Sequence, residues 1–151
     1  MRNSLIAFGL AAFVTHPALA YDGLVAKQRF DYPGVFTTVG GAAIKQVAVG
    51  YETLGTLDTS GSNAILIPHF FSGNSHFAGR YKADDKAPGY WDAIVGPGKP
   101  LDTDKYFLIG IDSLCNINTK DGVTITTGPA SIDPDTGKPY ALRFPEVMPT
   151  I

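Results

Sequence analysis

The sequence has few of the residues that build disulfide frameworks, metal sites and nucleic-acid interfaces. Its 151 residues include one cysteine, Cys115, so no internal disulfide can form. Three histidines without the spacing of metal ligands predict no metal site. A net charge of −2 predicts no nucleic-acid partner. Cys115 follows a mostly apolar run, so we expect a buried thiol.

Long amphipathic helices are also missing. Parallel strands need crossover segments of about a dozen residues, usually helical, and the sequence has strand-like runs without them. An apolar content of 44% with 17% charged residues is typical of a globular chain, and the length allows one domain. We therefore expect a loop-rich α/β protein that contains only the opening part of its fold.

The first twenty residues are predicted to be a secretory signal peptide. A short segment with one positive charge, residues 1–3, precedes an apolar core at residues 5–14, which is too short to span a bilayer. Residues 18–20 form a small-x-small cleavage site. The prediction is a periplasmic or secreted protein of residues 21–151, with no membrane attachment after cleavage. The alternative is an uncleaved amphipathic or core helix.

Several runs have the composition of β-strands. Residues 35–39 and 44–54, separated by a Gly-Gly turn, predict a hairpin. In the second run, the residues alternate between two faces, which predicts a strand with one buried face. One face has Val47, Val49, Tyr51 and Thr53, and the other has Gln46, Ala48, Gly50 and Glu52. Residues 64–68 predict a buried strand, and residues 106–111 a central strand covered on both faces. Residues 90–95 predict one or two helical turns that end at Gly96.

A polar, glycine-bearing loop, His69 to Arg80, follows the predicted strand at 64–68. In open α/β sheets, ligands bind where the chain leaves the carboxyl ends of the strands. A strand that ends in His-x-x-x-Gly is also how α/β-hydrolases build half of an oxyanion hole, from a backbone N–H just past the strand. This loop is the candidate functional site.

The chain resembles the homoserine O-acetyltransferase family of the α/β-hydrolase fold. The resemblance rests on an ordered series of blocks between Val47 and Ile151. These are Tyr51-Glu52-Thr53-x-Gly55-Thr56, His69-x-x-Ser72-Gly73-x-Ser75-His76-x-Ala78-Gly79-Arg80, Pro88-Gly89-Tyr90-Trp91-Asp92, Gly96-Pro97-Gly98-Lys99, Asp102-Thr103-Asp104-Lys105-Tyr106-Phe107, Thr127-Gly128-Pro129-Ala130-Ser131-Ile132 and Thr136-Gly137-Lys138-Pro139-Tyr140.

The resemblance implies acyl transfer through a Ser-His-Asp triad whose serine lies in a Gly-x-Ser-x-Gly elbow. It implies that the backbone N–H of Phe71 is one oxyanion donor, a role for which a main-chain group is well suited because it is rigid. The implied partner is a small-molecule acyl substrate. No bound cofactor is expected, and acetyl-CoA is a co-substrate only if the protein is an acyltransferase. The family also allows a homodimer of the full-length protein.

Phe70, Ser72 and Arg80 are the predicted substrate-binding residues. An arginine can bind a carboxylate through two parallel hydrogen bonds, although a surface or structural role is favoured for Arg80. Ser75 and His76 are adjacent and have no recognisable orienting carboxylate, so we expect them to shape the loop and the pocket wall. His69 is expected to be hydrogen-bonded inside the fold.

The chain departs from the family in two places. The family segment Gly-Gly-Cys-x-Gly-Ser-Thr-Gly-Pro is replaced by residues 115–129, which are longer and lack the glycine pair. No Gly-x-Ser-x-Gly elbow occurs, and residues 73–77 lack its last glycine. We therefore expect residues 21–151 to be an N-terminal fragment of an α/β-hydrolase domain, inactive alone and poorly stable, with an unpaired edge and an uncovered face at strand 106–111.

Three functional hypotheses follow. The first is an exported α/β-hydrolase relative that cleaves small acyl esters when full length, since water would be available outside the cell and acetyl-CoA would not. The second is a homoserine O-acetyltransferase that uses acetyl-CoA. The third is a non-catalytic remnant or binding module.

Overall fold

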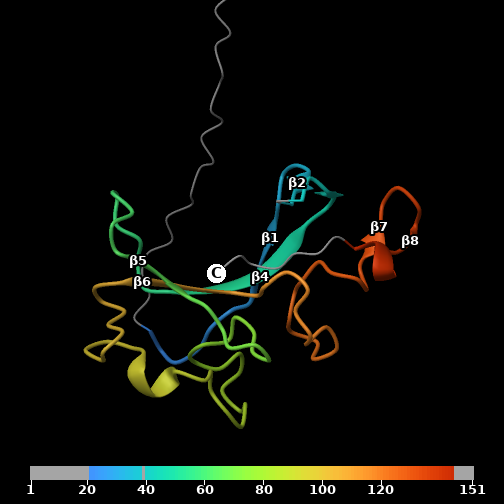
Figure 1. The fold of residues 1–151 in the computed structure, drawn as a ribbon. Helices are drawn as coiled ribbons and strands as arrows, with labels where there is room; N and C mark the ends of the chain where they lie inside the picture. Colours follow the sequence, from blue (N-terminus) through green and yellow to red (C-terminus); the bar gives the residue numbers. More distant parts are fainter. Residues whose placement is uncertain (1–20, 39, 145–151) are drawn as a thin grey trace, which may run out of the picture.

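A computed structural model describes residues 21–38 and 40–144, so the predicted signal peptide lies outside the described residues. Four strands form a mixed sheet in the order β1-β4-β6-β5 (Figure 1). Its strands are β1 (Gln28–Asp31), β4 (Ala48–Leu54), β5 (Ala64–Ile67) and β6 (Phe107–Ile111). β4 pairs antiparallel with β1 and β6, whereas β5 and β6 run parallel.

The remaining elements are short. They are the pairs β2 (Phe36–Thr37) with β3 (Ala43–Ile44) and β7 (Ile132–Asp133) with β8 (Lys138–Pro139), and the 3₁₀ helices η1 (Asp92–Ile94) and η2 (Ala141–Arg143). The turn that η1 forms confirms the prediction for residues 90–95. Within residues 21–38 and 40–144, no helix has the length and apolarity needed to cross a membrane.

The predicted hairpin between residues 35–39 and 44–54 is only partly correct. β2 and β3 do pair, but each has two residues, and β3 ends at Ile44. Gln46 then adopts a positive φ of 52°, which interrupts an extended chain before β4 begins at Ala48. β4 is thereby free to pair with β1 on one side and β6 on the other.

The buried face of β4 is the one with the smaller and more polar side chains. Ala48, Gly50 and Glu52 are buried along with Leu54, whereas Val49, Tyr51 and Thr53 are half-buried. A glutamate on this face requires partners for its charge. The sheet therefore contains a polar cluster close to its centre.

β5 and β6 correct two expectations. β5 is not fully buried, because it lies at the end of the sheet and its Leu66 is 58% exposed. β6 has paired strands on both sides, so the expected unpaired edge is wrong for this strand; among the described strands, β1 and β5 are the edges of this sheet. One face of β6 is only partly covered, as Ile111 is exposed while Leu108 is fully buried.

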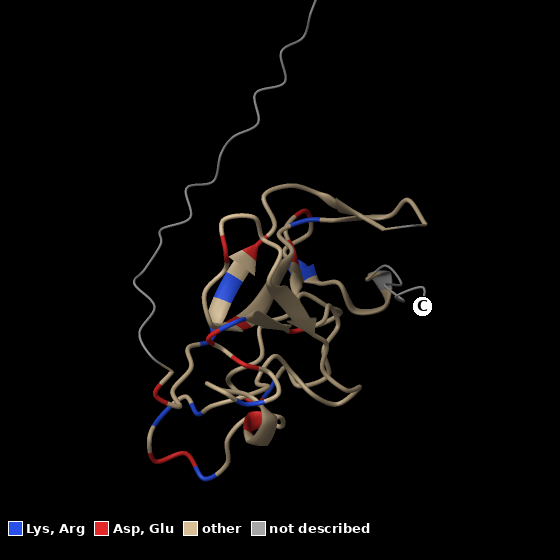
Figure 2. Ribbon diagram, turned by 90° about the vertical axis from the view of Figure 1, so that its left-hand side faces the viewer, with Lys and Arg blue, Asp and Glu red and all other residues tan. Residues whose placement is uncertain are grey.

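Two apolar clusters stabilise the fold. The larger contains Leu54, Ile67, Phe77, Ala78, Val95 and Leu108, and the smaller contains Ile44, Val47 and Tyr140. Phe77 is completely buried and fixes the segment after β5 against the sheet. Basic and acidic residues are interspersed along the ribbon (Figure 2).

Candidate active site

The loop after β5 begins with a tight turn, residues 69–74, here called the donor turn. The Gly73 N–H donates to the Phe70 carbonyl over 2.8 Å. Phe70 is 57% exposed and Phe71 is 89% exposed. The Phe71 N–H donates to no other group in the part of the chain that the structure describes. This amide is therefore available to a ligand, as an oxyanion donor must be, and its role stays a prediction.

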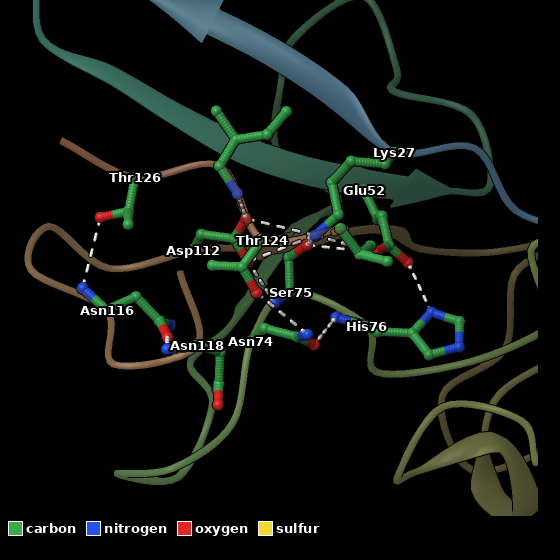
Figure 3. A network of polar contacts seen from close by, with 12 residues as sticks. Lys27, Glu52, Asn74, Ser75, His76, Asp112, Asn116, Asn118, Thr124 and Thr126 are labelled. Atoms are coloured by element: carbon green, nitrogen blue, oxygen red, sulfur yellow. Dashed lines mark hydrogen bonds and ion pairs between the residues drawn. The ribbon is translucent and has the colours of Figure 1, made fainter. Parts of the chain in front are cut away.

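Two asparagines from the segment after β6 hold the donor turn. Asn118 Nδ2 donates to the Ser72 carbonyl over 2.9 Å, and Asn116 Nδ2 donates to the Gly73 carbonyl over 2.9 Å. Asn116 is buried, and both asparagines lie beside the turn in Figure 3. The turn is thus anchored through its carbonyls, which leaves the amide of Phe71 unused.

His69 is hydrogen-bonded inside the fold, as predicted. Its Nε2 accepts the Ser113 N–H over 3.2 Å, so the ring proton lies on Nδ1, which is 2.6 Å from the Phe70 carbonyl. Asn116 Nδ2 also lies 3.3 Å from Nε2. Both ring nitrogens are therefore occupied by internal contacts.

A buried polar network lies behind the donor turn and consists of Lys27, Glu52, Ser75, His76, Tyr81 and Asp112 (Figure 3 shows all but Tyr81 by name). Asp112 lies just beyond β6 and accepts the Ser75 N–H over 2.7 Å and the Ile125 N–H over 2.8 Å. Lys27 Nζ donates to Ser75 Oγ and lies 3.2 Å from Asp112 Oδ2.

Glu52 is the centre of the second half of this network. Its Oε1 accepts the Tyr81 hydroxyl over 2.6 Å and the Ser75 hydroxyl over 3.0 Å, and lies 3.3 Å from Lys27 Nζ. Its Oε2 lies 3.1 Å from His76 Nδ1, and the His76 ring stacks on Tyr81 with 4.2 Å between ring centroids. Lys27 thus lies between two buried carboxylates.

The environment shifts the pKa values of two of these groups in opposite directions. Burial alone would raise the pKa of Glu52, but hydrogen bonds from His76 and Tyr81 and the charge of Lys27 together hold it below its ordinary value. Burial, followed by the hydrogen bond to Glu52, raises the pKa of Tyr81. The network therefore contains an ionised glutamate and a neutral tyrosine at neutral pH.

This geometry stabilises the loop and does not favour attack by Ser75. Ser75 is completely buried, and its hydroxyl is shared between Lys27 and Glu52. The described contacts include no hydrogen bond between Ser75 and His76; both side chains bond to Glu52 instead. An orienting carboxylate, which the sequence did not reveal, is thus present, but an ester outside the protein cannot reach the Ser75 oxygen.

Sequence reasoning missed Lys27, Glu52 and Asp112. Glu52 alternates with apolar neighbours in its strand and therefore looked like a solvent-facing residue. A usable signal is that Ala48 and Gly50 share its face, because small residues on a strand often mark a close approach by other groups. A Cβ at Gly50 would lie 2.2 Å from Asp112 Oδ2.

The other predicted residues lie in different surroundings. Arg80 is half-buried and its Nε donates to the Asp85 carbonyl over 3.1 Å, so it already has an internal partner. Cys115 is half-buried rather than fully buried, and burial raises the pKa of its thiol. Within the described ranges, no group of three or more acidic, histidine or cysteine side chains could hold a metal ion.

The lowered pKa of Glu52 predicts a loss of stability in acid. Because the folded-state pKa lies below the ordinary value of 4.5, ionised Glu52 stabilises the fold above pH 4.5, and this contribution is lost as the pH falls through the folded pKa. Urea unfolding between pH 7 and acid pH should show a weaker acid loss in Glu52→Gln than in the wild type. Tyr81→Phe, which removes one hydrogen bond to Glu52, should show an intermediate loss; equal acid losses in all three would contradict the prediction.

Solved structures identify the class of fold. Esterase E22 superposes with a TM-score of 0.77 and 57% identity over 81% of this chain and 33% of that chain. Homoserine O-acetyltransferase from Bacillus anthracis superposes with a TM-score of 0.76 and 49% identity over 81% of this chain and 32% of its own. The described sheet and donor turn therefore correspond to the N-terminal part of an α/β-hydrolase fold.

Curated relatives identify the family that the chain resembles. The homoserine O-acetyltransferase of Methanococcoides burtonii is 48% identical over 125 residues, which are 83% of this chain and 24% of that protein. The homoserine O-succinyltransferase of Magnetococcus marinus is 48% identical over 138 residues, 89% of this chain and 34% of that protein. No family model matches the chain. The chain is similar to homoserine O-acyltransferases and spans about a third or less of these relatives' length.

Proposed function

We propose that the protein containing this chain is an exported esterase that hydrolyses small acyl esters through a serine triad. The described residues contribute one oxyanion donor, the Phe71 N–H, and the wall around it. The observation that carries the proposal is this amide, which belongs to an exposed residue just past the carboxyl end of a parallel strand and has no internal acceptor among the described residues.

Hydrolysis is preferred to acyl transfer for two reasons. The identity to esterase E22, 57%, exceeds the 49% identity to the acetyltransferase structure from Bacillus anthracis. The predicted signal peptide would also place the protein where water is the abundant acyl acceptor. An acyl-enzyme that admits water releases the free acid and regenerates the serine hydroxyl.

In the proposed reaction, this chain contributes an oxyanion donor, and a nucleophile elbow outside the given residues contributes the serine. The serine oxygen attacks the ester carbonyl, the carbonyl oxygen gains negative charge, and the Phe71 N–H donates a hydrogen bond to it. The alcohol leaves with the serine proton, and water then releases the acid from the acyl-enzyme. Phe70 and Ser72 would contact the substrate beside the donor. Arg80 would contact it only after releasing the Asp85 carbonyl.

A homoserine O-acetyltransferase using acetyl-CoA is the second candidate, supported by the names of the curated relatives. The location and N-terminus of the mature protein distinguish the two. An exported protein that begins near Tyr21 supports the esterase, whereas a cytoplasmic protein that retains Met1 refutes it. The third candidate, a non-catalytic remnant, requires a stop codon directly after Ile151; an open frame that encodes Gly-x-Ser-x-Gly supports the enzyme.

The chain alone is expected not to hydrolyse p-nitrophenyl acetate above the rate without protein, because Ser75 is buried and hydrogen-bonded. The measurement is the release of p-nitrophenol by purified residues 21–151, with Ser75→Ala as the comparison. Hydrolysis by the wild-type chain that disappears in Ser75→Ala would show that this chain has its own nucleophile. A longer protein that includes the elbow should hydrolyse the same ester.

A further inference from the structure

The Phe71 N–H lies in the same peptide plane as the Phe70 carbonyl. A peptide unit is rigid and planar, and in its trans form the N–H and the C=O point in opposite directions. The bond between Phe70 and Phe71 is trans. The groups that hold the Phe70 carbonyl therefore set the direction in which the Phe71 N–H points.

Two groups hold this carbonyl. The Gly73 N–H donates to it over 2.8 Å, and His69 Nδ1 lies 2.6 Å from it. A carbonyl oxygen has two lone pairs, so these two donors can occupy both. A Cβ at position 73 would lie only 3.2 Å from the same oxygen and 3.1 Å from His69 Cβ. The turn can close this tightly around the carbonyl because residue 73 is glycine.

The two donors differ in what they connect. The Gly73 bond joins two parts of the donor turn and moves with the turn. The His69 ring reaches outside the turn, because its Nε2 accepts the Ser113 N–H over 3.2 Å and lies 3.3 Å from Asn116 Nδ2. Both of those groups belong to the chain that leaves β6. Among the described contacts of the Phe70 carbonyl, that of His69 therefore fixes its direction relative to the sheet.

The contact with Ser113 also decides which nitrogen of His69 carries the proton. A backbone N–H can only donate, so Nε2 accepts and the proton of the neutral ring lies on Nδ1. That proton faces the Phe70 carbonyl, which can only accept. The Ser113 amide thus keeps His69 in the form that can hold the carbonyl.

We infer that His69 is a positioning residue, which aims the Phe71 N–H at the oxyanion by holding the Phe70 carbonyl through Nδ1–H. The inference rests on the proposed function, because it treats Phe71 as the oxyanion donor. It assigns to His69 no proton transfer and no contact with the substrate. An oxyanion donor is effective because its direction is set before the charge develops, so an amide that points elsewhere lowers the rate.

Two substitutions separate the hydrogen bonds of His69. In His69→Asn, the amide nitrogen is as many bonds from Cβ as Nδ1 is, so it can still donate to the Phe70 carbonyl. In His69→Gln, the amide group is as many bonds from Cβ as Nε2 is, so it can accept the Ser113 N–H but places no donor at the Nδ1 position. Both variants lose the ring, so each serves as the control for the other.

The experiment measures the hydrolysis of p-nitrophenyl acetate by the longer protein that includes the nucleophile elbow, with thermal unfolding of each variant. His69→Gln should lower kcat by at least about tenfold with KM unchanged, because only the transition state carries the oxyanion. His69→Asn should keep kcat within about threefold of the wild type, because the donor to the carbonyl remains. Equal losses in both variants, a larger loss in His69→Asn, no loss in either or a rise in KM alone would overturn the inference.

Crystal structures of the same variants distinguish a failure of this inference from a failure of the proposed function. If the wild-type longer protein hydrolyses no ester, the proposed function fails, and the direction of the Phe71 N–H still tests the inference. This N–H should turn in His69→Gln and keep its direction in His69→Asn; an unchanged direction in His69→Gln would overturn the inference. If the glutamine variant does not fold, the asparagine variant decides, because a lower kcat or a turned Phe71 N–H in it would refute the role of Nδ1–H.

Discussion

Lys27→Met is expected to lower the free energy of unfolding by about 3–5 kcal/mol, the range found when one partner of a buried ion pair is removed. Lys27 Nζ lies 3.3 Å from Glu52 Oε1 and 3.2 Å from Asp112 Oδ2, and both carboxylates are completely buried. Methionine keeps the apolar stem and removes only the charge and its hydrogen bonds. The two carboxylates would then repel each other without a cation between them.

Urea unfolding of the two proteins measures this difference. Lys105→Met is the matched control, because Lys105 also contacts an aspartate, Asp102, at 3.0 Å, but its side chain is 71% exposed. Exposed ion pairs contribute little to stability, so this variant should unfold close to the wild type. Similar small losses in both variants would show that Lys27 is not needed to balance the buried charge.

Gly110→Ala is expected to destabilise the fold by about 1–3 kcal/mol through overpacking. A Cβ at position 110 would lie 2.5 Å from the Ser75 carbonyl oxygen and 2.5 Å from Phe77 Cδ1. The first of these is backbone, and Phe77 is completely buried, so neither can move aside cheaply. The segment after the donor turn would have to move away from β6.

Thermal unfolding together with amide hydrogen exchange checks this prediction. Protection should fall at Ser75, whose N–H donates to Asp112. Gly34→Ala serves as the control, because a Cβ there would meet only Tyr32 Cε1 at the ordinary distance of 3.6 Å. A Gly110→Ala protein with wild-type stability and unchanged Ser75 exchange would mean that the close approach of this segment to β6 is not essential.

The strands of the central sheet were the most predictable part of the fold. Residues 64–67 and 107–111 are short apolar runs, and the structure contains strands at both. A turn also follows Asp133, where the sequence has proline, aspartate and glycine in close succession, and the Gly137 N–H donates to the Asp133 carbonyl over 2.8 Å. These features depend on neighbouring residues in the sequence, which is why pattern reasoning finds them.

Features that depend on distant residues were not predictable in this way. The partners of Glu52 come from positions 27, 75, 76 and 81, and no local pattern brings them together. The break at Gln46 was missed because a glutamine with positive φ has no reliable local signature. The exposure of β5 was missed because burial depends on which strands lie beside it.

The contacts of His69 have a mechanical consequence. Its ring joins the chain that leaves β5, through the Phe70 carbonyl, to the chain that leaves β6, through the Ser113 N–H. A planar ring cannot change its width, so it acts as a rigid spacer between two neighbouring exits from the sheet. The imidazole therefore helps to set the gap between these exits, together with the hydrogen bonds from Asn116 and Asn118. A flexible side chain of similar length, such as glutamine, would leave that gap to the two asparagines.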